Sequence, residues 1–502
     1  MNLYEQFLEQ SSTIADLESA LSLFNWDLEV MLPRGAASRR AYQISTLAGF
    51  KHEMVVKELY PLLQQLQEAP EYEQLDALKK LNVQQALRNV EKDARLPKSF
   101  VSKLARTCSE AQQMWEQAKE ASDFGMFEPH LKEIFDLKKQ EADYYGYEEA
   151  PYDALLDTYE PGMKTAQVSA LFEKIKPELK HLLETVNRAP QVKDDFLSRA
   201  VKYDDQLRLG RKALELLEFD FDHGRIDTST HPFTTSMGME DVRITTRVEE
   251  QNISMLLFSS IHEHGHALYE QGLQSDMYGL PGGQPCSLSI HESQSRIWEN
   301  NVARGPHFWQ YFFKEFASVF KDNLRGLGPE DVFRAVNQVK PSLIRIMADE
   351  LTYHFHILLR FEIERDIING EMEVHDIPEA WSSKVQEYLG LEVPSDDKGE
   401  LQDIHWSIGA IGYFPTYSLG SFYAAQFFHF AQQEMPGLND DFAKGNYAGF
   451  KAWLSENIYQ HGRLYNSNTL CEKVTGQGLD TQFFMDYLRS KLSKVYAIEL
   501  QA

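Results

Sequence analysis

The sequence predicts a mostly α-helical fold with one small sheet, and two observations carry this prediction. Apolar residues recur at steps of three and four through most of the 502 residues, which is the period of one face of a helix. The stretch Phe219–Arg247 breaks that period with closely spaced Gly, Asp, Thr, Ser and Pro residues. No internal repeat or Pro/Gly/Ser-rich linker divides the chain, so we expect residues 1–502 to form one large helical domain with a central groove.

Six segments show the helical period clearly. In the first of them, Val56, Leu59, Leu63 and Leu66 share one helical face. Another begins directly after Pro97, and proline is favoured at the start of a helix. Each apolar stripe is typical of a helix that packs against a core. The predicted ranges are Glu53–Glu68, Lys98–Ala121, Val168–Val186, Arg208–Leu217, Leu343–Ile368 and Leu419–Gln433.

A small antiparallel sheet is expected where the helical period fails. Along Val242–Arg247, the side chains of Val242, Ile244 and Thr246 fall on one face. They alternate with Arg243, Thr245 and Arg247, which is the period of a strand. The edge of such a sheet can hold an extended peptide through main-chain hydrogen bonds. A second irregular stretch, Ser275–Ser289, contains three glycines and two prolines and therefore cannot form a regular helix.

Composition excludes several classes of partner and site. The 76 acidic and 50 basic residues give a net charge of −26, which repels nucleic acids and anionic membrane surfaces. The three cysteines are far apart in sequence, so neither a disulfide framework nor a cysteine zinc site is expected. The segment Met1–Ser12 is polar and acidic, unlike a signal peptide, and no apolar run approaches the roughly 18 residues of a membrane helix. We expect a cytoplasmic protein.

A zinc-binding motif lies in the segment Ile253–Leu273. His262 and His266 are four residues apart on a predicted helix, so both imidazoles project from the same face. They can therefore reach one zinc ion at about 2.0–2.1 Å. Glu263 lies beside the first histidine, where it can reach a water molecule at the metal. This H-E-x-x-H pattern is that of zinc peptidases.

A catalytic zinc usually takes a third protein ligand and leaves one position open. Glu292 is expected to be that ligand, because it lies on a predicted helix 26 residues after His266. His291 and His264 are rival ligands, but His264 is two residues from each motif histidine and points to another side of the helix. Such a site supports peptide hydrolysis by an activated water, with Glu263 as the general base.

Short signature segments occur in order along nearly the whole chain. They are Trp26–Asp27 with Met31–Gly35, Pro151–Asp157, Tyr159–Gly162, His231–Phe233, Asp241–Thr245, the H-E-x-x-H segment, His291–Gln294, Ile344–Asp349, Gly399 with Gln402–Trp406, and Gly412–Tyr417. Together they resemble the carboxypeptidase Taq family of metallocarboxypeptidases. The resemblance implies removal of single residues from the C-termini of short peptides, with broad side-chain tolerance. It also implies a helical fold with a long groove, related to neurolysin and the angiotensin-converting enzymes, a homodimer, and Zn²⁺ or Co²⁺ as the metal.

A carboxypeptidase must bind a terminal carboxylate. An arginine can do so with a bidentate pair of N–H···O hydrogen bonds. The resemblance gives this role to Arg345. We expect Arg345 on the predicted helix Leu343–Ile368, with Asp349 one turn further on to orient its guanidinium. Without the resemblance, the same two residues would be interpreted as an ion pair on a helix surface.

Other residues are candidates for contact with the substrate. The candidate donors to an oxyanion or a carboxylate are His231, His405, Tyr413 and Tyr417. Core packing is the alternative interpretation of each tyrosine. Gln402 is expected either to contact substrate or to cap a buried helix, and Arg243 is expected to support the sheet and the groove.

Two alternatives to a carboxypeptidase follow from the motif. A zinc oligopeptidase or dipeptidyl carboxypeptidase would use the same metal site without a carboxylate anchor one residue from the cut. A zinc-stabilised binding or scaffold protein belongs to a different class. Glu263 argues against it, because a structural zinc site needs no general base and is normally closed by four ligands.

Overall fold

The computed structural model describes residues 1–500, and the chain forms two compact units made of separate chain segments. The first unit contains residues 1–94, 193–336 and 423–479, and the second contains 95–192, 337–422 and the described residues from 480 onward. The described residues are mostly helical, with one three-stranded sheet, as the sequence predicts. None of the described helices is both long and apolar enough to cross a membrane.

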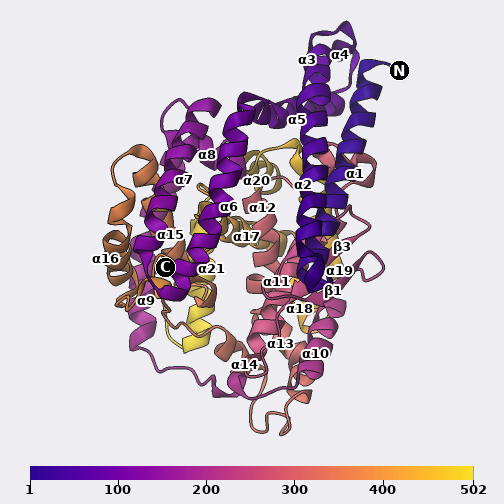
Figure 1. The fold of residues 1–502 in the computed structure, drawn as a ribbon. Coiled ribbons are helices and arrows are strands. Elements are labelled where there is room, and N and C mark those ends of the chain that lie inside the picture. Colours follow the sequence, from indigo (N-terminus) through magenta and orange to yellow (C-terminus); the bar gives the residue numbers. More distant parts are fainter. Residues whose placement is uncertain (501–502) are drawn as a thin grey trace. The chain divides into compact units, whose positions relative to one another are not determined.

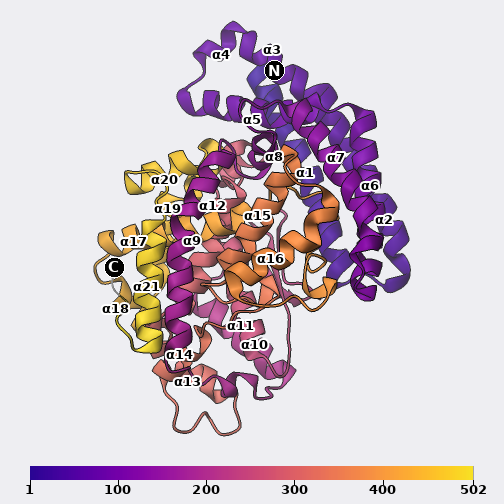
Figure 2. The same cartoon turned by 90° about the vertical axis from the view of Figure 1, so that its left-hand side faces the viewer.

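The first unit begins with a long helical hairpin, formed by α1 (Leu3–Val30) and α2 (Ala37–Met54), which lie side by side in Figures 1 and 2. A π-helical turn, η2 (Val55–Leu59), leads into α3 (Tyr60–Glu68). The predicted helix over 53–68 is therefore confirmed as a continuous helical path with a wider turn inside it. The short α4 (Pro70–Gln74) then leads into α5 (Ala77–Arg95). The core between these helices is apolar and includes Phe7, Leu63, Leu66 and Val83.

The remaining helices of the first unit include α11, which carries the predicted metal motif, and α12, which contacts it (Figure 1). Asn252 caps the start of α11 by accepting a hydrogen bond from the backbone N–H of Met255, and Ser287 caps α12 in the same way for Ile290. The helices are α10 (Tyr203–Leu216), α11 (Ile253–Gln271), α12 (Leu288–Arg296), α13 (Pro306–Ser318), α14 (Pro329–Val336), α18 (Leu438–Ala443), α19 (Ala448–Asn457) and α20 (Ser467–Thr475). The π-helical η6 (Ile297–Ala303) continues directly from α12.

The sheet has the order β1-β3-β2. Its strands are β1 (Gly224–Thr228), β2 (Thr234–Ser236) and β3 (Val242–Thr246). β3 runs antiparallel to β2 but parallel to β1, so the prediction of an antiparallel sheet is wrong for the β1–β3 pair. Alternation along a strand fixes which face is buried but does not fix the direction of its neighbour. Val242 and Ile244 pack with Ala267 of α11, so the sheet lies directly against the helix that carries the motif.

The second unit is built around pairs of helices. α6 (Lys98–Ala121) has the predicted bounds and lies beside α7 (Phe124–Tyr145) in both views (Figure 2). The other helices are α8 (Pro151–Tyr159), α9 (Thr165–Arg188), α15 (Tyr353–Asn369), α16 (Ile377–Leu389) and α21 (Gln482–Tyr496), and α17 (Pro415–Glu434) starts in this unit. The helices predicted over 168–186, 208–217 and 419–433 are confirmed as α9, α10 and α17, apart from one residue at the end of α10.

The predicted helix over 343–368 is wrong in its first third. α15 begins at Tyr353, and Arg345 lies in a single 3-10 turn, η7 (Arg345–Met347). The Asp349 carboxylate accepts hydrogen bonds from the backbone N–H groups of Leu351 and Thr352 at 3.0 Å. An aspartate that binds nearby backbone N–H groups offers the chain an alternative to helix, so the apolar spacing alone does not reveal this break.

Candidate active site

Two helices of the first unit bring three candidate metal ligands together. His262 and His266 lie one turn apart on α11, and Glu292 lies on α12. The Nε2 atoms of the two histidines are 3.5 and 3.4 Å from Oε2 of Glu292. One ligand atom from each residue lies within 4.8 Å of the other two. Two imidazole nitrogens and one carboxylate oxygen form the donor set of many catalytic zinc sites, so these residues fit a zinc ion.

Gly265 allows the two helices to approach this closely. A Cβ atom at Gly265 would lie 2.5 Å from the carbonyl oxygen of Gln294 and 2.6 Å from Cα of Ser295. Both of those residues belong to α12, two and three positions after Glu292. Glycine is therefore required at this position of the motif if the glutamate is to reach the two histidines.

The ionic surroundings keep Glu292 charged. Burial opposes ionisation, but Arg296 and His262 outweigh it and hold the pKa of Glu292 well below its usual range. Arg296 donates from Nε to Oε1 of Glu292 at 2.7 Å, which leaves Oε2 directed toward the histidines. Burial lowers the pKa of His262, yet Glu292 and Glu299 outweigh that effect and raise it to about 10. A cation that binds there must therefore displace a proton.

Each histidine also has a partner on its other ring nitrogen. Nδ1 of His262 lies 2.9 Å from Oε2 of Glu299, a residue of η6. Nδ1 of His266 lies 2.6 Å from Nδ1 of His291, whose Nε2 lies 2.9 Å from Oε1 of Glu270. His291 thus meets His266 on the ring nitrogen opposite the one that faces Glu292.

His264, the second rival ligand, is turned away from the three donor atoms. It is fully buried, with ring contacts to Phe219 and Trp298. Burial lowers the pKa of His264 to about 3, so its ring is neutral near neutral pH. Among the described residues, the cluster of possible metal ligands contains neither of the two rivals.

Glu263 lies beside the first histidine and is held by the sheet. Its Oε2 accepts a hydrogen bond from Oγ1 of Thr234 at 2.7 Å, and Thr234 starts the edge strand β2. Burial raises the pKa of Glu263 above its usual range, so its carboxylate is a better proton acceptor than an exposed one. The expected position of the sheet beside the metal helix is confirmed by this contact.

Two further candidates lie near the sheet. Arg243 forms a two-pronged ion pair with Asp241 at 2.8 and 2.7 Å, and its guanidinium carbon lies 4.4 Å from the ring centre of Trp26 on α1. It therefore joins β3 to α1, consistent with its expected supporting role. The His231 side chain is exposed to solvent, and its carbonyl oxygen accepts from Ser229 at 2.6 Å.

The second unit contains a buried cluster of charges around Arg345. Nε and NH2 of Arg345 donate to Asp403 at 3.1 and 2.9 Å, and NH1 donates to the hydroxyl of Tyr353 at 3.1 Å. Asp403 also accepts from Nε of Arg360 at 2.8 Å. The expectation that Asp349 orients Arg345 is wrong, because Asp349 binds backbone N–H groups and the hydroxyl of Thr352, while Asp403 binds the guanidinium.

The other candidates of the second unit gather close to this cluster. Nε2 of His405 lies 3.2 Å from the hydroxyl of Tyr417, and the ring centres of His405 and Tyr413 are 5.3 Å apart. Burial, with the nearby Arg345, lowers the pKa of His405 to about 3. The Gln402 amide accepts from the backbone N–H of Arg345 at 2.8 Å and donates to the carbonyls of Leu343 and Gly399. Gln402 thus fixes the backbone around Arg345.

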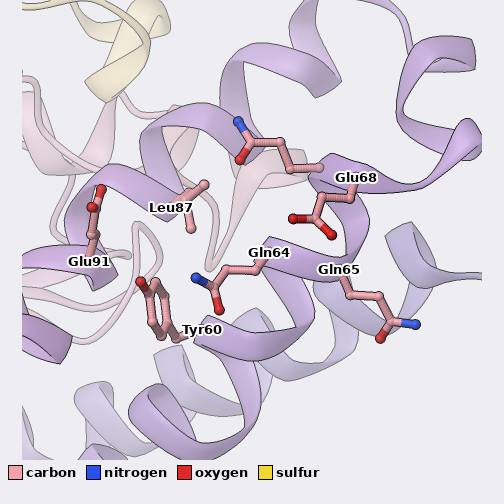
Figure 3. A pocket seen from close by; sticks show the side chains of 7 residues that line it. Tyr60, Gln64, Gln65, Glu68, Leu87 and Glu91 are labelled. Carbon is pink, nitrogen blue, oxygen red and sulfur yellow. The ribbon is translucent and has the colours of Figure 1, made fainter.

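A separate pocket lies between α3 and α5 in the first unit (Figure 3). Tyr60, Gln64, Gln65 and Glu68 line it from α3, and Leu87 and Glu91 line it from α5. None of the predicted site residues lines this pocket, and its side chains include no histidine or cysteine.

Comparison with known proteins identifies the family. The sequence profile described as carboxypeptidase Taq (M32) metallopeptidase matches residues 6–492. The chain belongs to the carboxypeptidase Taq family. It is 38% identical to thermostable carboxypeptidase 1 of Thermus thermophilus, over 98% of this chain and 99% of that protein. It is 35% identical to carboxypeptidase 1 of Bacillus subtilis, over 99% and 100%.

The fold agrees with this assignment. The crystal structure of a family carboxypeptidase from Deinococcus radiodurans matches with a TM-score of 0.96 at 38% identity, over 99% of this chain and 100% of that chain. The resemblance drawn from the signature segments is therefore confirmed. As a carboxypeptidase Taq family member, the protein is a metallocarboxypeptidase that acts on peptides with a divalent metal, typically zinc.

Several residues that contact the candidate site residues escaped the sequence analysis. Glu270 follows His266 by one helical turn, and that spacing on a buried helix is a signal that could have found it. Thr234, Glu299 and Asp403 carry no such local signal, because each meets its partner across 29 to 58 residues of chain.

Proposed function

We propose that this metallocarboxypeptidase removes single residues from the C-termini of short peptides, with zinc held by His262, His266 and Glu292. The observation that carries the proposal is the convergence of these three donor atoms, with Glu263 next to the first of them on the same helix. Bound zinc would lower the pKa of a water molecule toward about 7 and polarise the scissile carbonyl.

Glu263 is proposed as the general base. Its Oε2 is held by Thr234, so Oε1 is the oxygen that takes the proton from the attacking water. Burial raises the pKa of Glu263, which helps the carboxyl group to keep that proton until it is passed to the leaving amine nitrogen. The edge of β2 that does not pair with β3 is proposed to pair with the backbone of the peptide.

Arg345 is proposed to bind the terminal carboxylate. A guanidinium has five N–H groups, and the contacts with Asp403 and Tyr353 use Nε–H, one N–H of NH1 and one of NH2. One N–H remains on NH1 and one on NH2, and together these form a fork that suits a carboxylate. We propose His231, His405, Tyr413 and Tyr417 as further donors to the carboxylate or the oxyanion, and Gln402 as a support for the Arg345 backbone.

The finer features of the fold and setting belong to the same proposal. We propose a single catalytic domain over residues 1–502, with a long groove and a fold related to neurolysin and the angiotensin-converting enzymes. The family match over residues 6–492 supports a single domain. We also propose a cytoplasmic homodimer that accepts Co²⁺ in place of Zn²⁺. None of the three cysteines, all within the described residues, forms a disulfide, which is consistent with a reducing compartment.

The deciding experiment compares a short peptide with a free C-terminus and the same peptide with a C-terminal amide. The zinc-loaded protein should shorten the free acid one residue at a time, and mass spectrometry should show little change in the amide. Equal cleavage of both would contradict the role of Arg345 and favour an oligopeptidase. Release of two residues at a time would favour a dipeptidyl carboxypeptidase.

A further inference from the structure

We propose that His291 and Glu270 form a hydrogen-bonded relay that fixes the ring orientation and the tautomer of His266. This inference rests on the proposed function only in taking His266 as a metal ligand. It assigns His291, a rival ligand on sequence grounds, a different role as a positioning residue behind the site.

The relay is formed by the two helices that supply the ligands. His266 and Glu270 are one turn apart on α11, and His291 projects from α12 directly before Glu292. The rings of His291 and His266 are nearly parallel, with centres 4.6 Å apart and planes 26° apart, and they meet through their Nδ1 atoms. All three side chains are at most 18% exposed. The relay is therefore shielded from water, which would otherwise compete for these hydrogen bonds.

The contacts allow only one direction of hydrogen bonding. A neutral imidazole has one N–H, and a ring nitrogen that binds a metal must offer a lone pair. When Nε2 of His266 binds the metal beside Glu292, the proton of His266 must sit on Nδ1 and be donated to Nδ1 of His291. Nδ1 of His291 must then accept, which places its own proton on Nε2, directed at Oε1 of Glu270. Two N–H groups facing each other across 2.6 Å would repel.

The two histidines are thus supported in different ways. His262 meets the carboxylate of Glu299 directly. Arg296 donates to the same oxygen of that carboxylate, and Arg304 donates to the other oxygen. His266 meets the imidazole of His291, and the carboxylate of Glu270 contacts the far nitrogen of that ring. Partners of this kind set the tautomer and basicity of metal ligands, and their loss typically costs about 10–100-fold in metal affinity.

Asparagine and glutamine variants can separate the parts of the relay. In His291→Asn, Oδ1 occupies the place of Nδ1, so the acceptor for His266 is kept and the contact with Glu270 is lost. His291→Leu removes both contacts. In Glu270→Gln, the amide oxygen can still accept from His291, whereas Glu270→Leu cannot.

The test measures the zinc dissociation constant of each metal-free variant by competition with a coloured chelator. Circular dichroism melts of the metal-free forms show whether each variant is folded. We expect His291→Leu to weaken zinc binding about 10–100-fold, His291→Asn and Glu270→Leu to weaken it less, and Glu270→Gln to stay close to the unmodified protein. Glu299→Gln gives the matching measurement for the partner of His262.

The outcomes separate this inference from the proposed function. His266→Leu should abolish tight zinc binding, and its failure to do so would overturn the ligand assignment itself. If His266→Leu abolishes binding but folded His291→Leu binds zinc as well as the unmodified protein, the relay is overturned. Loss of zinc from His291→Leu as complete as from His266→Leu would make His291 a ligand and also overturn the relay.

Discussion

The metal site of the first unit and the arginine cluster of the second unit are both sets of buried or partly buried charges, but their excess charges have opposite signs. The metal site contains four carboxylates and two guanidiniums: Glu263, Glu270, Glu292, Glu299, Arg296 and Arg304. The hydrogen-bonded arginine cluster contains two guanidiniums and one carboxylate: Arg345, Arg360 and Asp403. The first excess suits a divalent cation, and the second suits the single negative charge of a peptide C-terminus.

The difference matches the two unlike ligands that we propose for these regions. Burying an uncompensated charge is costly, so such a charge is expected where a ligand balances it. In the metal site, opposing charges from Arg296 keep Glu292 ionised. In the arginine cluster, Arg345 and Arg360 both keep Asp403 ionised against burial, and its pKa lies far below the usual range.

The largest effect should come from separating proton transfer from metal binding. Glu263→Gln keeps the shape of the side chain but cannot accept the proton of the attacking water. We expect kcat to fall about 10²–10⁴-fold. Zinc affinity should be nearly unchanged, because Glu263 is outside the cluster of three ligand atoms. Peptide hydrolysis and chelator competition on one preparation measure both quantities, and a kcat within a few-fold of the unmodified enzyme would remove Glu263 from the mechanism.

The second prediction concerns the arginine cluster. Arg345→Met removes the charge and the fork, and Arg345→Lys keeps only the charge. For peptides with a free C-terminus, we expect kcat/KM to fall about 10–100-fold in the Met variant and less in the Lys variant, because hydrogen bonds to charged groups contribute about 1.5–3 kcal/mol. Any slow cleavage of amidated peptides should be unaffected.

Arg188→Met is a matched control, since the Arg188 side chain is 81% exposed. It should leave both kinetic constants unchanged. Zinc affinity should be the same in all three variants. An equal loss of kcat/KM on free and amidated peptides would show that Arg345 supports the fold and does not bind the terminal carboxylate.

The two regions also differ in how much of them the sequence could reveal. Spacing alone placed His262 and His266 on one helical face, and both lie in the regular helix α11. The arginine cluster depends on the ion pair of Arg345 with Asp403, which are 58 residues apart in sequence. It also depends on the 3-10 turn at Arg345, where apolar periodicity predicted a helix. Neither a long-range ion pair nor a parallel strand pair leaves a local pattern.

The third prediction tests the contact between α11 and α12. Gly265→Ala places a Cβ atom where it meets the α12 backbone at 2.5 Å. We expect the free energy of unfolding to fall by about 1–3 kcal/mol, with weaker zinc binding as Glu292 is displaced. Gly49→Ala, in α2, is the control, because a Cβ there meets nothing within 4 Å. Alanine favours helix by up to about 1 kcal/mol over glycine, so the control should be neutral or stabilising. Equal melting shifts would contradict a role for Gly265 in helix approach.

The smallest effect should come from a carboxyl group that contrasts with Glu292. Glu364 of the second unit is fully buried and accepts hydrogen bonds from Tyr152, Trp406 and the backbone of Gly412 at 2.8, 2.8 and 3.0 Å. Burial raises the pKa of Glu364 from 4.5 to about 7, whereas the arginine beside Glu292 lowers that pKa. A group whose folded pKa is raised binds its proton more tightly in the folded state than in the unfolded state.

The folded state therefore loses stability as the pH rises from about 4.5 to about 7, and above that range the loss is complete. Glu364→Gln cannot ionise, so it lacks this loss. In urea titrations we subtract the unfolding free energy of the variant from that of the unmodified protein. We expect this difference to decrease between about pH 5 and pH 7 and to level off above that. Glu184→Gln, at an exposed position, should show no such trend. A difference that stays constant with pH would mean that Glu364 is ionised throughout and that its three donors, like Arg296 for Glu292, outweigh its burial.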